Sequence, residues 1–216
     1  MILERKDTDL FYSLWFPLLD FTNSRYPICP KMGAIEFGKS VDMRDAKTIA
    51  NYIWKHTEVI DEYLAEAALS EEHCEIVTGW KKCRPGKYIL ERHLKKGSVF
   101  LSADTAEVYM VLGLYSTWEE VLCGRPLPVM MEAVLLPFRD KIITDGLVVS
   151  KNIVFGRGAA ADFKDAYMDA KKAERFVFRC DFFAGRFRTA RLFLLGNTDY
   201  LAVTIIWRLH ISNRYF

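Results

Sequence analysis

The chain has 216 residues, of which 51% are hydrophobic and 27% charged, and its formal net charge is +2. This is the composition of a globular protein, and it excludes a disordered, collagen-like or coiled-coil chain. The small net charge gives no global field that would favour nucleic acid or a membrane as partner.

The cysteines and the N-terminal residues indicate a reducing compartment. The odd number and irregular spacing of the cysteines predict free thiols rather than a disulfide framework. They are Cys29, Cys74, Cys83, Cys123 and Cys180. Residues 1–7 mix acids and bases where a signal peptide is apolar. The apolar run over 10–21 is short and contains Pro17 and Asp20, which argues against a membrane span. We therefore expect a soluble cytoplasmic protein.

The first part of the chain has the pattern of helices. Residues 7–25 open with acids and a threonine and are apolar nearly all round, which predicts a helix buried on most sides and kinked near Pro17. Helical spacing of apolar residues predicts three more helices, over 42–55, 59–68 and 70–79. Asp42 can cap the first of these, and the second either continues it or restarts at Thr57. Residues 1–84 are thus a predicted helical region.

The pattern changes to strands after a turn signal at 83–86. Runs of β-forming residues predict strands over 87–94, 99–103, 106–115, 129–138, 141–149 and 148–155. The strands over 129–138 and 141–149 form a hairpin around 139–140, and Asp145-Gly146 can turn the chain into the last strand.

Two short helices are predicted among these strands. Thr117 and Glu120 form a capping box, and the helix that they begin should end at Gly124. The second helix spans 162–172. Residues 85–173 are therefore a predicted antiparallel β-sheet region, and the fold class is α+β, with a helical N-terminal half packed on this sheet.

The C-terminal segment, residues 174–216, differs in composition. It contains no lysine, although the first 173 residues hold 15, and it contains seven arginines and seven of the 15 phenylalanines. With three acidic residues its charge is +4, against −2 for residues 1–173. We expect it to add strands to the sheet. Such a shift in composition fits a separate task, and it also fits late acquisition, for example by a change of reading frame.

This segment holds the candidate binding residues. Arginine neutralises phosphates and phenylalanine stacks on unpaired bases. The candidates for contact with nucleic acid or a partner are Arg175, Arg179, Arg186, Arg188, Arg191, Phe182, Phe183 and Phe187. The alternation of arginine and phenylalanine over 175–179 is equally the pattern of an ordinary amphipathic strand. If exposed, the three phenylalanines form a patch suited to a protein partner or to a second copy of the chain.

Residues with metal-binding or catalytic chemistry do not form a recognisable motif. His73, Cys74, Cys83 and His93 are possible zinc ligands, but no Cys-x-x-Cys pair brackets a knuckle, so we predict neither a metal nor a cofactor. Glu58, Glu62 and Glu66 lie along one helical stripe, which is either a solvated face or an acidic patch for a basic partner. The loop at 156–158 either holds a phosphate on its N–H groups or serves only as flexible backbone.

One pair of segments resembles a known group of proteins. Residues 108–114 (VYMVLGL) and 134–147 (VLLPFRDKIITDGL) resemble a phrase of uncharacterised bacterial proteins, some of which carry a C-terminal SEC-C zinc motif. The likeness extends over roughly 85–173. It implies a bacterial cytoplasmic protein and a strand-turn-strand at 134–147. In that arrangement Pro137 lies at a strand edge or end, where a missing N–H is tolerated, and Gly146 permits a positive φ. The cysteine-rich SEC-C ending is missing, so the resemblance implies no metal. The likeness carries no assigned activity and no catalytic residues.

From these observations we expect a non-enzymatic binding or interaction module. Its partner would be another protein or a second copy of the chain. One alternative is nucleic-acid binding through the Arg/Phe-rich segment over 174–216. Another is a metal-dependent hydrolase that uses helical carboxylates with His73 or His93.

Overall fold

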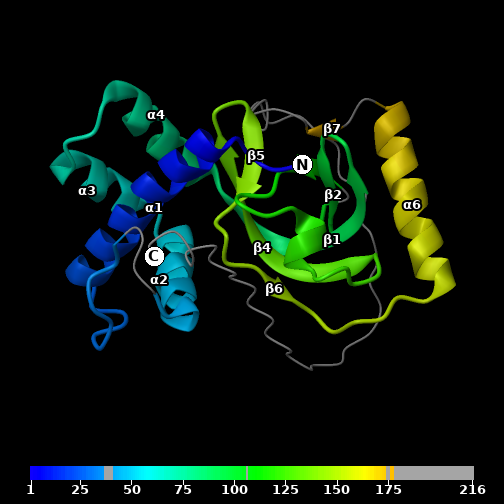
Figure 1. The fold of residues 1–216 in the computed structure, drawn as a ribbon, viewed down its shortest axis with the longest axis horizontal. Coiled ribbons are helices and arrows are strands. Elements are labelled where there is room, and N and C mark those ends of the chain that lie inside the picture. The colour runs from blue at the N-terminus through cyan, green and yellow to red at the C-terminus, as the bar shows by residue number, and fades with distance from the viewer. Residues whose placement is uncertain (37–40, 106, 174–175, 178–216) are drawn as a thin grey trace, which may run out of the picture.

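The computed structural model describes residues 1–36, 41–105, 107–173 and 176–177. Its N-terminal half is helical (Figure 1). The helices are α1 (Arg5–Arg25), α2 (Met43–Lys55), α3 (Glu58–Glu66) and α4 (Glu71–Gly79), followed by the short 3-10 helix η1 (Trp80–Lys82). None of the described helices has both the length and the hydrophobicity needed to cross a membrane.

Local side-chain chemistry sets where these helices begin. The Asp42 carboxylate accepts hydrogen bonds from the backbone N–H groups of the first turn of α2, and the Ser70 hydroxyl accepts one from His73 N–H in α4. A new helix, α3, begins after Thr57, so the chain restarts there. Pro17 lies inside α1, which is one helix from Arg5 to Arg25.

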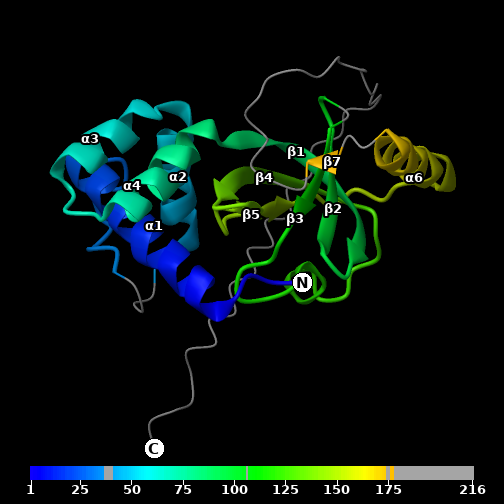
Figure 2. The same ribbon diagram turned by 90° about the horizontal axis from the view of Figure 1, so that it is seen from above.

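The strands that follow close into a barrel (Figure 2). They are β1 (Arg84–Leu94), β2 (Gly97–Ser102), β3 (Val108–Val111), β4 (Val129–Phe138) and β5 (Lys141–Thr144), with the short helix α5 (Trp118–Val121) between β3 and β4. The pairing order is β1-β2-β3-β5-β4, and β4 also pairs with β1, which closes the ring. Only the β3–β5 pair is parallel within this ring. A register shift between Leu90 and Arg92 lets β1 bend and serve both neighbours.

This connectivity resembles that of the OB fold, a five-stranded Greek-key barrel. Trp118 of α5 and Leu122, the residue after this helix, enter the barrel interior, where they pack with side chains of all five strands. That interior cluster comprises Tyr88, Leu90, Phe100, Tyr109, Val111, Trp118, Leu122, Val129, Met131, Ala133, Leu135 and Ile142. These side chains pack against one another as a core inside the barrel.

Three further elements lie outside the ring. The strand β6 (Val149–Ser150) pairs with β4, and β7 (Phe176–Val177) pairs in parallel with β3. Helix α6 (Arg157–Lys172) stands at the side of the barrel away from the N-terminal helices (Figure 1). It covers the outer face of β1, β2 and β3 with Phe163, Tyr167 and Ala170.

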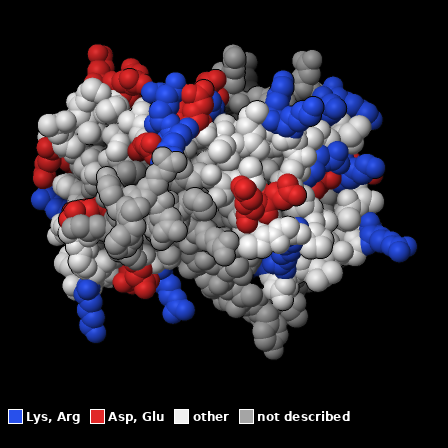
Figure 3. Space-filling view, in the orientation of Figure 1, with Lys and Arg blue, Asp and Glu red and all other residues white. Residues whose placement is uncertain are grey.

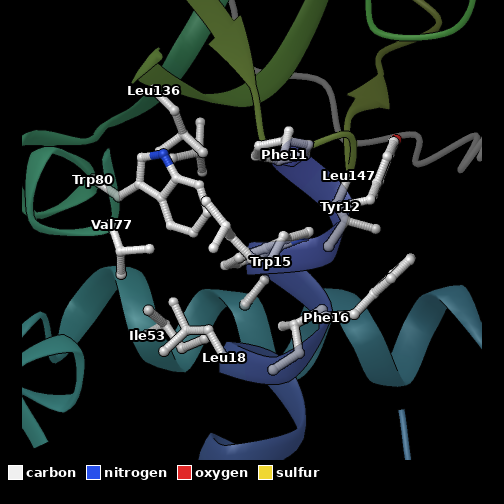
Figure 4. Close-up of a cluster of buried hydrophobic side chains, with 14 of the residues drawn as sticks. Phe11, Tyr12, Trp15, Phe16, Leu18, Ile53, Val77, Trp80, Leu136 and Leu147 are labelled. Carbon is white, nitrogen blue, oxygen red and sulfur yellow. The ribbon is translucent and has the colours of Figure 1, made fainter. Parts of the chain in front are cut away.

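The N-terminal helices cover the opposite face of the barrel, over β4 and β5. Figure 4 shows Trp15 of α1 at the centre of this contact, between Trp80 and Leu136 on one side and Ile53 on the other. The Trp15 ring stacks on Trp54 with centroids 5.0 Å apart and meets Trp80 edge-on at 5.9 Å. The helices and the barrel thus share one core.

The structure confirms the predicted α+β fold class, and it corrects several boundaries. The sheet is mixed rather than purely antiparallel, because β3 pairs in parallel with β5 and β7. The turn signal at 83–86 overlaps the start of β1, because residues 84–86 already pair with β4. The strand predicted over 148–155 has only the two residues of β6, because only these find a neighbour on β4. Helix α6 begins at Arg157, five residues before the prediction.

Candidate functional site

The predicted binding residues of the C-terminal segment lie outside the described residues. This applies to Arg175, Arg179, Arg186, Arg188, Arg191, Phe182, Phe183 and Phe187. Of the segment over 174–216, the structure describes only the backbone of β7, which lies beside β3 with Val108 opposite Phe176.

The possible zinc ligands are not gathered into one site. Among the residues that the structure describes, no group of three or more histidine, cysteine, aspartate or glutamate side chains could hold a metal ion. His93 in β1 places its Nδ1 2.9 Å from the Ser98 hydroxyl in β2, and burial lowers the pKa of its imidazole. Burial raises the pKa of the Cys83 thiol to about 11, so it stays protonated near neutral pH and is a poor nucleophile.

The carboxylate stripe on α3 makes contacts within the fold. Glu62 accepts a hydrogen bond of 2.7 Å from the Tyr26 hydroxyl, and Arg25 at the end of α1 lies 3.5 Å from Glu62 and 3.8 Å from Glu66. Glu58 lies 3.2 Å from His56. Glu62 and Glu66 therefore join α3 to the end of α1, and the side chain of Glu58 stays exposed. Acidic side chains are frequent on this part of the surface (Figure 3).

Gly156–Gly158, the other candidate for ligand contact, is the start of a helix. Gly156 is the N-cap of α6, and Arg157 and Gly158 are its first residues. The loop expected here is accordingly shorter, since the run of small residues that follows Gly158 joins the helix.

A buried carboxylate at the junction of helices and barrel is the strongest polar feature of the described residues. Asp145, directly after β5, has a side chain with no exposed surface. Its carboxylate accepts hydrogen bonds from Trp54 Nε1 at 2.9 Å and from Leu147 N–H at 3.0 Å, and Lys47 Nζ lies 3.7 Å away. Lys47 and Trp54 both belong to α2, so Asp145 ties the helical region to the barrel.

The residue after this carboxylate explains why the turn is tight. Gly146 has φ +79°, and a Cβ there would lie 3.2 Å from the Tyr12 hydroxyl oxygen. The sequence indicated Asp145-Gly146 as a turn, and it gave no signal for the ion pair, whose partners lie on a distant helix. The Asp145 carboxylate is fully buried and has three partners within the fold, so it anchors the helices to the barrel.

A second buried carboxylate fixes the hairpin between β4 and β5. Asp7, in the first turn of α1, pairs with Arg139 and, at 2.9 Å, with Lys141. Arg139 also reaches Glu72 of α4 at 2.6 Å, and it has φ 52° at the hairpin turn. These contacts hold the hairpin against two helices, and they use the charges that an anionic ligand would need.

A shallow groove runs along α1. Ser13, Pro17 and Phe21 line it from the helix, and Ile35 lines it from the following loop. Asp20 is the main polar group at its wall, and its carboxylate already accepts a hydrogen bond of 2.8 Å from Ile35 N–H. Ser24 and Glu36 complete the lining, and most of the exposed lining surface is apolar.

The remaining candidate is the open edge of the sheet at β6. The ladder with β4 ends when Lys151 N–H donates to the Met130 carbonyl at 2.8 Å. The chain then runs as a stretched loop to α6 (Figure 1). Within it Ile153 is 38% exposed and Val154 is 91% exposed, which makes Val154 the most exposed of the large apolar residues that the structure describes. We define residues 149–155 as the β6 edge.

Comparisons with known proteins add no relationship. No protein-family model matches the chain, and neither the curated proteins nor the solved structures include a match. The resemblance to the OB fold is thus one of strand connectivity alone.

Proposed function

We propose that the chain is a non-enzymatic interaction module whose contact surface is the β6 edge. The observation that carries the proposal is the exposure of Ile153 and Val154 directly after a strand whose outer side faces no described strand. An unprotected strand edge with apolar side chains is a template for pairing with another extended chain.

Two outer faces of the barrel are covered by helices of the same chain. OB-fold barrels bind oligonucleotides and oligosaccharides on the face of their second and third strands. In this chain that face is apolar and buried beneath α6, through residues such as Val99, Leu101 and Met110. The opposite face lies under α1 and its neighbours. Pairing at an edge requires neither cover to move.

A peptide-binding measurement tests the proposal. The probe is a panel of eight-residue peptides in which valine or isoleucine alternates with threonine or lysine. At least one peptide should bind the full chain and bind Val154→Asp at least about tenfold more weakly, because a desolvated charge is costly in a strand interface. Met168→Asp is the matched control, since Met168 is an exposed apolar residue on α6. Equal binding of every peptide to wild type and Val154→Asp would refute the proposal.

Nucleic-acid binding through the C-terminal segment is the second candidate. It is favoured by β7, which brings the start of that segment beside β3 of an OB-like barrel. Single-stranded oligonucleotides should then bind at low salt, release as salt rises, and bind weakly to a variant with Arg186, Arg188 and Arg191 changed to Ala. Absence of oligonucleotide binding at low salt would refute nucleic-acid binding by this segment. The described residues offer no support for the metal-dependent hydrolase, since they bring no set of three ligands together.

A further inference from the structure

Helix α6 covers the outer face of β1, β2 and β3 through a narrow stripe of side chains. Three of its 16 residues are buried, Phe163, Tyr167 and Ala170, whereas the shorter helix α2 buries five. The Arg92 guanidinium of β1 lies over the Tyr167 ring, 4.1 Å from its centroid. Among the described residues, no backbone hydrogen bond joins α6 to a strand. The helix therefore depends on a few side-chain contacts, at the outer edge of the molecule in two perpendicular views (Figure 1 and Figure 2).

The start of α6 has little local stabilisation. Its N-cap is Gly156, which has no side-chain acceptor, whereas Asp42 and Ser70 cap α2 and α4. The first turn contains no acid, and Arg157 places a positive charge at the positive end of the helix dipole. The alanines at 159–161 favour a helix, but a helix of this length is marginal by itself in water. We therefore expect α6 to unfold when it leaves the barrel.

The segment before α6 can stay attached while the helix moves. Lys151 Nζ lies 3.0 Å from the Glu132 carboxylate of β4 and anchors the start of this segment. Beyond it, among the described residues, the backbone N–H groups of 152–155 donate to no backbone carbonyl. At the other end Phe155 meets Phe163 of α6 edge-on at 5.0 Å. Release of α6 thus breaks side-chain contacts and leaves the helix tethered beside its docking face.

The sheet face beneath α6 is apolar. Its side chains are Ile89 of β1, Val99 and Leu101 of β2, Val108 and Met110 of β3, and Met130 of β4. Each is at most 8% exposed, so release of α6 would uncover one continuous apolar patch, and such patches mark interaction sites. In OB barrels the corresponding face binds ligands. Aliphatic and methionine side chains suit an apolar partner surface better than bases or phosphates.

We infer that α6 is a detachable cover and that the face beneath it binds an amphipathic helix of a partner protein in its place. The chemistry of the occupant follows from α6 itself, which presents two aromatic rings at Phe163 and Tyr167 and a small side chain at Ala170. A partner helix with the same spacing fits the same strip of the sheet. The population of docked α6 then sets the apparent affinity for the partner. This surface is separate from the β6 edge, so the inference goes beyond the proposed function.

A peptide with the sequence of α6 tests whether the face accepts a helix from another molecule. The probe is residues 156–173 with a fluorescent label, and the readout is its anisotropy. The Phe163→Asp chain should bind the probe at least about tenfold more tightly than wild type, because its own α6 no longer competes. Met168→Asp changes an exposed residue of the same helix, so this matched control should bind as wild type does. A probe with Phe163→Asp should bind each chain at least about tenfold more weakly.

Hydrogen exchange of the wild-type chain gives a readout that needs no folded variant. The amides of α6 should show at least about a hundredfold less protection than those of β4, because the helix opens without global unfolding. An excess of the unlabelled peptide should speed the exchange of α6 at least about threefold, since it competes for the face. The peptide carries Met168→Leu, so that its fragments differ in mass from those of the chain.

The possible results separate the occupants. Equal binding of the probe to wild type and Phe163→Asp, equal protection of α6 and β4, or α6 exchange that the peptide leaves unchanged would each overturn the inference. A single-stranded oligonucleotide that speeds α6 exchange where the peptide does not, or a wild-type dimer that the peptide dissociates, would overturn the partner helix in favour of nucleic acid or a second copy. Val154→Asp should bind the probe as wild type does, so failure here leaves the proposal for the β6 edge standing.

Discussion

The buried Asp145 carboxylate gives the sharpest test of how the helices and the barrel are joined. In Asp145→Ala, the Trp54 Nε1–H and the Leu147 N–H lose their acceptor, and Lys47 loses its counter-ion. Each unsatisfied buried donor costs about 1–3 kcal/mol, and removing one partner of a buried ion pair costs about 3–5 kcal/mol. Because the Lys47 side chain keeps 19% of its surface exposed and can turn to water, we expect a total loss of about 3–5 kcal/mol.

Urea unfolding of the full chain measures this loss directly. Asp145→Asn keeps the shape and one acceptor, so it should cost less, about 2 kcal/mol. Asp140→Ala, an exposed acid at the hairpin tip, is the control and should change stability by less than about 0.5 kcal/mol. In a Lys47→Met background, Asp145→Ala should cost at least about 0.5 kcal/mol less than in wild type. A loss below about 1 kcal/mol for Asp145→Ala would refute the anchoring role.

Three further predictions concern separate parts of the fold. Burial lowers the pKa of the His93 imidazole below its usual 6.5, so the unfolded chain binds a proton at this side chain more tightly than the folded chain does. The contribution of His93 to stability is therefore complete above about pH 6.5 and is lost as the pH falls below that value. His93→Gln should show a smaller fall in urea midpoint between about pH 7.5 and about pH 5 than wild type does. The Cys83 thiol, with its pKa of about 11, should react with iodoacetamide more than about tenfold more slowly than the exposed Cys123, as measured by peptide mapping. Phe163→Ala should remove about 3–5 kcal/mol of packing beneath α6 and speed amide exchange in that helix while Met168→Ala does not.

Each of these has a definite contrary result. A pH profile of His93→Gln that parallels wild type would show that this histidine does not contribute to the acid sensitivity. Equal alkylation rates for the two cysteines would mean that Cys83 is accessible in solution. Unchanged exchange in α6 after Phe163→Ala would show that other contacts hold the helix to the barrel.

Local chemistry was the part of this fold that the sequence could predict. The helix starts at Asp42 and Ser70 and the capping box at Thr117 follow from side-chain oxygens that accept from nearby N–H groups, and all three are confirmed. The hairpin of β4 and β5 is also confirmed, because its strands are joined by a two-residue turn at 139–140.

Long-range pairing was the part that it could not predict. Closure of the barrel depends on β1 meeting β4, whose paired residues lie 39 to 51 positions further along the chain, and no local pattern specifies that partner. The same limit hid the Asp145 anchor, since Trp54 lies 91 residues away. For the strand over 148–155 the composition was right for pairing, but a strand needs a neighbour, and β4 supplies one only as far as Lys151.

The strand-forming composition of 148–155, of which only two residues are paired, bears on how the protein could contact other molecules. The apolar faces of the barrel are each covered by the chain's own helices, and the interior is filled, so the fold satisfies its hydrophobic surface almost everywhere that the structure describes. Several large apolar residues are exposed, and Val154, in a segment that is tethered at both ends, is the most exposed of those that the structure describes. Strand edges that do not pair are commonly protected by charged or proline residues, so the β-forming composition of this segment supports the proposed contact with another chain.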